Sequence, residues 1–314
     1  MTLLLQYTLI FASVLLLVAL GGCFCERSGV INIGLEGVMV IGALGGALVM
    51  KFLPVSVGAP AMIFVTILAS ALTGLLYSLL LAVAAIHFKA DQTITGTAMN
   101  MLATAAATVT VKAMNTAASG GSNVSSEISF TQARDLFIIR FGSFEFNWFM
   151  VVAAAALVIS YVLLYKTRFG LRLMACGEHP QAADSVGIHV RKMRYAGVLI
   201  SGILGGIGGI VYITAGVSSW KFETGVAGFG FLALAVMIFG AWHPIKIALA
   251  SLLFGFCRAL GNVYSGFDFL MALHMPGVVY NMLPYLISLI VLAFTSGNSR
   301  APKAAGIPYD KESR

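Results

Sequence analysis

Residues 166–194 read KTRFGLRLMACGEHPQAADSVGIHVRKMR and form one long charged stretch inside an otherwise apolar chain. Six residues of this stretch are basic, whereas only Glu178 and Asp184 are acidic. Apolar runs end just before it and begin just after it. Short loops rich in Lys and Arg stay on the cytoplasmic side of a membrane. The stretch therefore predicts a cytoplasmic loop, and the orientation of the neighbouring spans follows from it.

The middle of this loop has the pattern of a short amphipathic helix. Pro180 falls where a first turn would begin, and Gly187 falls just past the expected end. A helix held at the membrane surface between two spans is suited to receive a push from a soluble partner.

The composition places the whole chain in a membrane. Of its 314 residues, 59% are hydrophobic and 10% are charged, whereas soluble domains carry roughly 25% charged residues. The net charge of +7 does not indicate nucleic-acid binding, because the basic residues lie in loops and in the tail. We therefore expect a polytopic membrane protein that contacts lipid and binds no nucleic acid.

The apolar runs predict an all-α bundle of about nine transmembrane helices, within a range of eight to ten, since a helix needs about 20 apolar residues to cross the hydrocarbon. The expected spans are 2–21, 33–53, 58–86, 92–112, 147–165, 195–217, 224–241, 244–262 and 276–295. The first of these has no Lys or Arg before it, so it reads as a retained span and not as a cleaved signal peptide.

Alternation of the spans assigns the remaining segments to the two sides. Residues 1–295 are expected to form the transmembrane domain, with the charged loop 166–194 inside, the loop 113–146 outside and a cytoplasmic tail at 296–314. The N-terminus is then outside and the C-terminus inside. Glycines four residues apart, such as Gly202 and Gly206, indicate close helix packing. The similar runs 37–46 and 197–206 suit either a duplicated bundle or chance.

No enzyme constellation is present in the sequence. It contains no HExxH, GxSxG or P-loop pattern, so any energy from ATP must come through another subunit. Its histidines share no ligand spacing, and a metal site is not expected. Its four cysteines lack zinc spacing and are interpreted as reduced thiols: Cys23, Cys25, Cys176 and Cys257.

Polar residues within or beside the spans are the candidates for a transport path, because such residues are costly in lipid. They gather in ERSGVINIGLEG at 26–37 and KADQTITGTAMN at 89–100. Either they bond neighbouring helices, or they form a gate or the wall of a path. The path candidates are Asn32, Glu36, Asp91, Gln92, Thr95, Asn100, Phe229 and Phe231. Arg258 is expected to reach the membrane surface or to pair with Glu223 or Asp268.

These stretches, together with 169–188 and GFGFLALAVMIFGAWHP at 228–244, resemble the permease subunits of bacterial ABC importers. The resemblance is to the nucleoside-uptake branch of the simple-sugar and branched-chain amino acid permeases. It implies a type II importer fold in which the loop at 169–188 contains the helix that docks on the ATPase. The chain departs from the family pattern at His179, Phe229 and Ala241, where the family commonly has Asn, Arg and a basic residue.

The resemblance assigns the ATPase-coupling role to one continuous set of residues and to the glycine after it. They are Gly177, Glu178, His179, Pro180, Gln181, Ala182, Ala183 and Gly187. Ala183 is expected on the docking face, so that Ala183→Arg should obstruct the ATPase.

The resemblance also implies the partners and the function. The partners are an ATP-binding subunit that holds ATP and Mg, a second permease subunit in a heterodimer, and an extracytoplasmic substrate-binding lipoprotein. This chain itself would need no cofactor and catalyse nothing, and it would lie in the bacterial inner membrane. The expected function is nucleoside import. A permease for a simple sugar such as ribose, a passive channel or secondary transporter, and a membrane enzyme are the alternatives.

Overall fold

The computed structural model describes residues 2–142, 144–215, 217–267, 271, 276–295 and 301–311. The helices in these ranges are α1 (Thr2–Arg27), α2 (Leu35–Phe52), α3 (Ala59–Ala82), α4 (Gln92–Ala118), α5 (Thr131–Asp135), α6 (Trp148–Lys166), α7 (Arg168–Glu178), α8 (Pro180–Ser185), α9 (Val190–Ile213), α10 (Phe229–Phe239), α11 (Pro244–Val263) and α13 (Gly277–Thr295). Short 3-10 turns are η1 (Val55–Val57), η3 (Phe222–Thr224) and η4 (Tyr264–Gly266), and η2 (Val83–His87) is a π-helical turn. The strands are β1 (Glu127–Ser129), β2 (Ile138–Phe141), β3 (Phe144–Asn147) and β4 (Ser219–Lys221).

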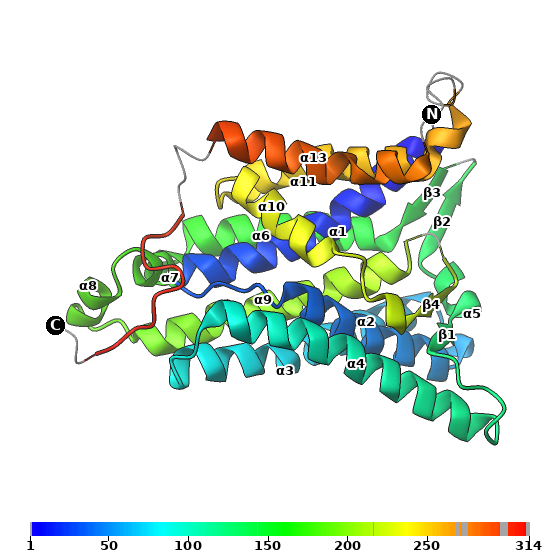
Figure 1. Cartoon of the computed structure of the whole chain (residues 1–314), viewed down its shortest axis with the longest axis horizontal. Helices are drawn as coiled ribbons and strands as arrows, with labels where there is room; N and C mark the ends of the chain where they lie inside the picture. Colours follow the sequence, from blue (N-terminus) through cyan, green and yellow to red (C-terminus); the bar gives the residue numbers. More distant parts are fainter. Residues whose placement is uncertain are drawn as a thin grey trace.

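The long helices run along one common direction and give the molecule two distinct ends (Figure 1). One end carries α7 and α8 and is called the α8 end; the other carries the four strands and is called the strand end. Among the described residues, seven helices are long and apolar enough to cross a membrane: α1, α2, α3 with η2, α4, α6, α9 and α11 with η4. The predicted polytopic helical membrane fold is confirmed.

The seventh predicted span, 224–241, is wrong as a single crossing helix. Only α10 forms there, with 11 residues and therefore about 16 Å of length, against about 30 Å of hydrocarbon. Left-handed backbone interrupts the run at both ends, at Ala227 (φ 53°) and Gly228 (φ 78°) and again at Trp242 (φ 53°). The apolar composition suggested a span, but these turns limit the helix to 11 of the 18 predicted residues.

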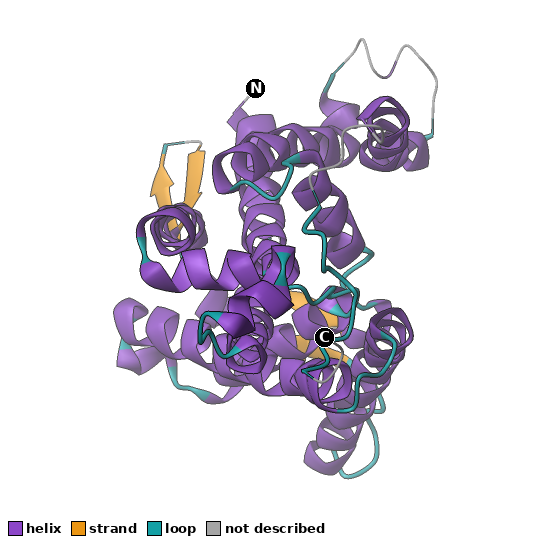
Figure 2. Cartoon of the chain, turned by 90° about the vertical axis from the view of Figure 1, so that its left-hand side faces the viewer, coloured by secondary structure: helices purple, strands orange, loops and turns teal. Residues whose placement is uncertain are grey.

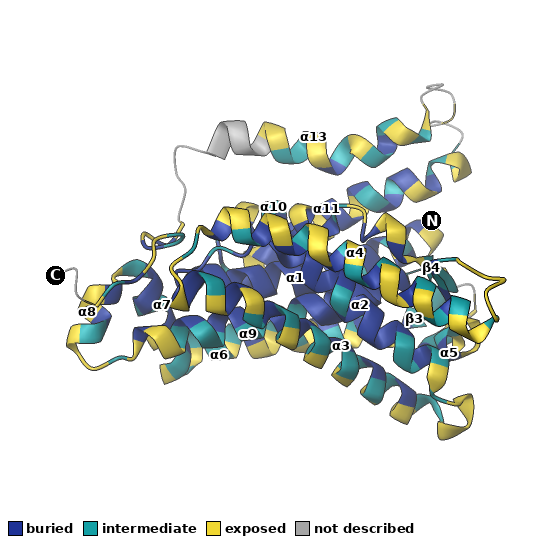
Figure 3. Ribbon diagram, turned by 60° about the horizontal axis from the view of Figure 1, so that its bottom comes forward, coloured by how far each residue is buried: buried dark blue, intermediate teal, exposed yellow. Residues whose placement is uncertain are grey.

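Helices α1 and α9 form the buried centre of the bundle (Figure 3). Helix α1 packs against α9, α10, α11 and α6, and α9 packs against α2 and α3. Helices α2, α3 and α9 approach closely at three glycines, since a Cβ on Gly42 or on Gly74 would collide with the backbone of Gly206. The predicted packing role of the small residues is confirmed at this contact.

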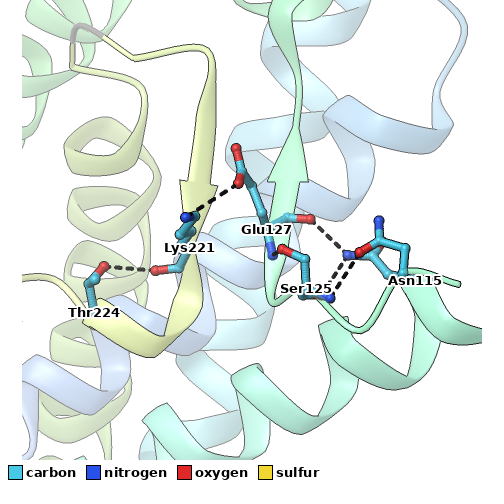
Figure 4. A network of polar contacts seen from close by, with 6 residues as sticks. Asn115, Ser125, Glu127, Lys221 and Thr224 are labelled. Carbon is cyan, nitrogen blue, oxygen red and sulfur yellow. Dashed lines mark hydrogen bonds and ion pairs between the residues drawn. The ribbon is translucent and has the colours of Figure 1, made fainter.

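The strand end contains two small antiparallel sheets that the predicted all-helical fold did not include (Figure 2). Strand β1 pairs with β4, and β2 pairs with β3. Helix α4 continues to Ala118, six residues beyond its predicted end at 112. The Asn115 amide donates to the carbonyls of Ser125 (2.8 Å) and Glu127 (2.9 Å), which fixes β1 against the end of α4 (Figure 4).

Candidate functional site

The short helix predicted within the loop 166–194 is present at the α8 end. Helix α7 ends at Glu178, and α8 begins at Pro180, which occupies its first position and needs no hydrogen-bond donor there. The chain turns away at Gly187, whose φ of 85° is a backbone conformation that favours glycine. The sequence prediction of a short helix between Pro180 and Gly187 is therefore confirmed.

One side of α8 is buried and the other is exposed. Pro180 and Ala183 are buried, whereas Gln181, Ala182 and Ser185 are exposed. The expectation that Ala183 lies on a docking face is wrong, because Ala183 is only 4% exposed and packs with Cys176, Val190 and Tyr309. A partner that binds α8 would contact its exposed members, and Ala183→Arg would instead disrupt the packing behind the helix.

Gly177 joins α7 to the end of α1. A Cβ at this position would collide with the carbonyl oxygen of Arg27, so only glycine allows the two backbones to approach this closely. The Gly177 carbonyl also accepts a hydrogen bond from the backbone N–H of Ala304, over 2.8 Å. Gly177 is therefore a buried junction of three chain segments.

Glu178 connects the same loop to the turn between α10 and α11. Its carboxylate lies 3.9 Å from the Arg27 guanidinium. The guanidinium in turn donates from Nε and Nη2 to the Trp242 carbonyl, over 3.3 and 3.2 Å. The Trp242 indole donates to Glu26 over 2.7 Å. These polar contacts therefore form a continuous connection from Glu178 to the turn that follows the C-terminal end of α10.

The four cysteines are free and buried among the described residues. Burial raises the pKa of the Cys176 thiol to about 11, which keeps this thiol protonated and unreactive near neutral pH. The described residues contain no group of three His, Cys, Asp or Glu side chains that could hold a metal ion.

Between α1 and α2, residues 28–34 are not helical, and side chains from α4 satisfy part of their backbone. Gln92 accepts from the Ile31 N–H over 2.7 Å. Asn100 donates to the Ile33 carbonyl over 3.0 Å and accepts from the Gly37 N–H over 2.8 Å. Irregular backbone at membrane depth is tolerated only when protein or water satisfies it. Both side chains therefore stabilise this segment directly.

The other polar path candidates also make structural contacts. Asn32 is buried and donates to Ser201 over 3.0 Å. Glu36 accepts from the N–H groups of Gly228 (2.8 Å) and Gly230 (2.7 Å), so its carboxylate caps the positive N-terminal end of α10.

At the start of α4, Asp91 accepts from the Ile94 N–H over 2.8 Å. Thr95 donates its hydroxyl to the Asp91 carbonyl over 2.7 Å. Asp91 is exposed and Thr95 is half-buried, so this pair lies at the rim of the polar segment.

The two phenylalanines at the start of α10 differ in burial. Phe229 is fully buried, with its ring 4.3 Å from the Tyr212 ring, whereas Phe231 is 48% exposed. Arg258 lies 5.3 Å from the Phe229 ring and donates to Asn281 over 3.1 Å. The expected pairing of Arg258 with Glu223 is wrong, because Glu223 pairs with Lys112. Asp268 lies outside the described residues.

Sequence reasoning missed Trp242 and misjudged Arg194. Arg194 counted as one of the basic loop residues, yet it lies within α9 and is 1% exposed. Its position at the start of a long apolar run was the available signal. The left-handed φ of Trp242 has no local sequence signal, and the residues that bond its carbonyl and its indole, Arg27 and Glu26, are distant in the chain.

Comparisons with known proteins agree along the whole chain. The chain matches the family model described as branched-chain amino acid transport system, permease component, over residues 4–294. It is 43% identical over 313 residues to the guanosine ABC transporter permease protein NupQ of Bacillus subtilis (strain 168), covering 98% of this chain and 96% of that protein. It is 38% identical over 309 residues to the nucleoside ABC transporter permease protein NupC of Lactococcus lactis subsp. cremoris (strain MG1363), covering 96% and 95%. No solved structure gives a significant match.

The fold and these similarities define a multi-pass helical membrane permease. Such a subunit works with an ATPase and a substrate-binding protein and is not itself an enzyme. The chain belongs to the family of branched-chain amino acid transport system permease components, as its resemblance predicted.

Proposed function

We propose that this chain is a permease subunit of an ATP-driven nucleoside importer. The observation that carries the proposal is the full-length similarity to the guanosine permease, 43% identity over 98% of this chain. The nucleoside permease at 38% identity supports the same substrate class. Because both matches cover the spans as well as the loops, they include every element that could contact a substrate.

The coupling step begins at α8 in this proposal. The ATPase docks on the exposed face that includes Gln181 and Ala182, and its movement displaces α7 and α8 together. Gly177 and Glu178 pass the displacement to Arg27 at the end of α1. The Arg27 bonds to the Trp242 carbonyl extend it to the turn beside α10. The route consists of contacts between backbones and bonded side chains, so it can transmit force in both directions.

The α8 end faces the cytoplasm in this proposal, and the strand end faces outward. The basic residues of 166–194 support that orientation in a bacterial inner membrane. ATP and Mg are bound by the separate ATP-binding subunit. A second, related permease chain completes a heterodimer, and a lipoprotein delivers the nucleoside to the strand end.

The transport path runs along one side of α4. Four threonines and Asn100 recur there at intervals of three or four residues and therefore share one side of the helix: Thr93, Thr97, Thr104 and Thr108. All four threonines are exposed or half-buried, although hydroxyls gain nothing from facing lipid. Weak hydroxyl contacts suit passage of a neutral nucleoside. Phe231, 48% exposed at the start of α10, offers a flat apolar surface, whereas Asn32 is buried against Ser201 and Phe229 against Tyr212.

Uptake by reconstituted transporter tests this function. The chain is placed in liposomes with its partner permease and ATPase, and the binding protein is added outside with labelled guanosine. We expect ATP-dependent uptake of the labelled guanosine. Unlabelled nucleosides should compete with it, and ribose should not. Competition by ribose alone would assign the transporter to simple sugars. Uptake that proceeds equally without ATP would instead indicate a passive channel.

A further inference from the structure

Residues 301–311, here called the strap, pack along the α8 end beside α7 and α8 (Figure 1). The backbone N–H of Ala304 donates to the Gly177 carbonyl over 2.8 Å. The Arg194 guanidinium donates from Nη1 to the Ile307 carbonyl, also over 2.8 Å. The strap is thereby hydrogen-bonded to α7 and to α9, two helices on either side of α8.

The strap also supplies the apolar backing of α8. Tyr309 is 7% exposed and packs in one buried cluster with Ala183, Cys176 and Val190. Ala183 is the residue through which α8 contacts this cluster, so Tyr309 lies behind the helix, on the side away from its exposed face. Two residues further, Lys311 is exposed again. Pressure on the exposed face of α8 therefore acts against the Tyr309 ring.

Arg194 shows why the strap is needed at this place. Its side chain is buried, and a buried guanidinium is costly unless hydrogen-bond acceptors compensate it. Among the described residues, Nη1 bonds to the Ile307 carbonyl whereas Nε and Nη2 lack partners. The Tyr309 ring lies 6.0 Å from the guanidinium carbon. The strap thus provides both the carbonyl and the ring that stabilise this buried charge.

The strap reaches the polar segment 28–34 as well. A Cβ on Gly306 would lie 2.9 Å from the Ile31 side chain, and a Cβ on Gly29 would lie 2.9 Å from Arg194 Nη2. The strap, Arg194 and the start of this segment are therefore in direct contact. At its end the strap meets the turn after α3, where Lys89 Nζ lies 2.8 Å from an Asp310 carboxylate oxygen.

We propose that the strap is a positioning element of ATPase coupling. It holds α8 against α9 and the segment 28–34, so that a push on α8 moves these elements together instead of deforming the loop. The inference rests on the proposed function, in which the ATPase docks on α8. It assigns a working role to Tyr309 and Arg194, neither of which contacts the exposed face of α8.

The test compares two single truncations within the strap. Tyr309→Ala removes the ring behind α8, whereas Ile307→Ala removes a side chain that is 57% exposed and leaves its carbonyl in place. Tyr309→Phe, which keeps the ring, is the conservative variant. Each complex is reconstituted with the partner permease, ATPase and binding protein. Copurified ATPase, ATP hydrolysis and nucleoside uptake are all measured.

We expect Tyr309→Ala to keep its ATPase but to transport about tenfold fewer nucleosides per ATP hydrolysed, a loss typical of a broken coupling between two sites. Ile307→Ala and Tyr309→Phe should keep the wild-type ratio. A purely structural role of Tyr309 would lower uptake and hydrolysis in proportion or leave both as they are. In either case the number of nucleosides transported per ATP would be unchanged in Tyr309→Ala, and that result would overturn the proposal.

If Tyr309→Ala does not accumulate, Tyr309→Leu takes its place under the same criteria, because it fills the cluster but lacks the ring over Arg194. Failure of the proposed function is recognised separately. In that case the wild-type complex shows no ATP-dependent nucleoside uptake before any variant is compared.

Discussion

At the strand end, separate stretches of chain are joined by short β-ladders and exposed ion pairs. At the α8 end, buried contacts join them in addition to the partly exposed pairs Arg27–Glu178 and Lys89–Asp310. Lys112 and Glu223 meet at the strand end over 2.6 Å, with both side chains at least 39% exposed. At the α8 end, Gly177 packs directly against the backbone of Arg27, and Arg194 is buried beneath the strap.

The difference indicates which end can pass a displacement into the bundle. Exposed ion pairs contribute about 0–1 kcal/mol each and can separate without moving the helices they join. Buried backbone contacts cannot separate without moving both partners, because protein interiors are closely packed. Substitutions at the α8 end should therefore change transport itself, while those at the strand end should change stability alone.

The largest contrast is expected between Gly177→Ala and Gly120→Ala. The new methyl group at Gly177 meets the Arg27 carbonyl, and such overpacking costs about 1–3 kcal/mol and separates α7 from α1. At Gly120, where φ is 61°, nothing lies within 4 Å, so only local backbone strain is added. We expect uptake per folded protein to fall about tenfold in Gly177→Ala, because a displaced α7 no longer passes its movement to α1 and a loss of coupling of about 1.4 kcal/mol corresponds to tenfold.

Uptake in the same liposomes, normalised to folded protein, provides the measurement. Gly120→Ala should stay close to the wild type. Equal losses of uptake in both variants would show that the two ends do not differ in how they pass a displacement into the bundle.

A smaller effect is expected from Asn115→Leu at the strand end. The change removes the bonds to Ser125 and Glu127 and the one accepted from Lys51 over 3.1 Å. Leaving these groups unpaired should lower the free energy of unfolding by about 1–3 kcal/mol. Thermal unfolding in detergent measures that loss. Uptake per folded protein should stay unchanged, and a selective loss of uptake would place the strand end within the transport mechanism.

The smallest effect concerns the exposed pair Lys112–Glu223. A hydrogen bond from Lys112 holds the pKa of the Glu223 carboxyl below its usual value. Because the folded-state pKa is the lower one, the pair stabilises the fold above the unfolded-state pKa and loses this effect as pH falls through the folded-state value. Melting temperatures of the wild type and Glu223→Gln should differ slightly at neutral pH and converge in acid. A difference that grows in acid would contradict this sign.

Much of the site could be found in the sequence because its signals are local. Pro180 and Gly187 mark the ends of α8 through their own backbone preferences, and the charge of 166–194 separates it from the spans. The burial of Ala183 could not be found this way. It depends on Tyr309, which is more than a hundred residues away along the chain.

The sequence by itself determined that the chain crosses a membrane many times, where most of its spans lie and which loop carries the short helix. These properties follow from the apolar length of each run and from local turn chemistry. Only the tertiary structure decided that α10 has just 11 residues, that Asn100 bonds the backbone of Ile33 and Gly37, and that the strap lies behind α8. Each of these depends on contacts between distant segments, and a local pattern carries no information about which distant group will satisfy a buried charge or carbonyl.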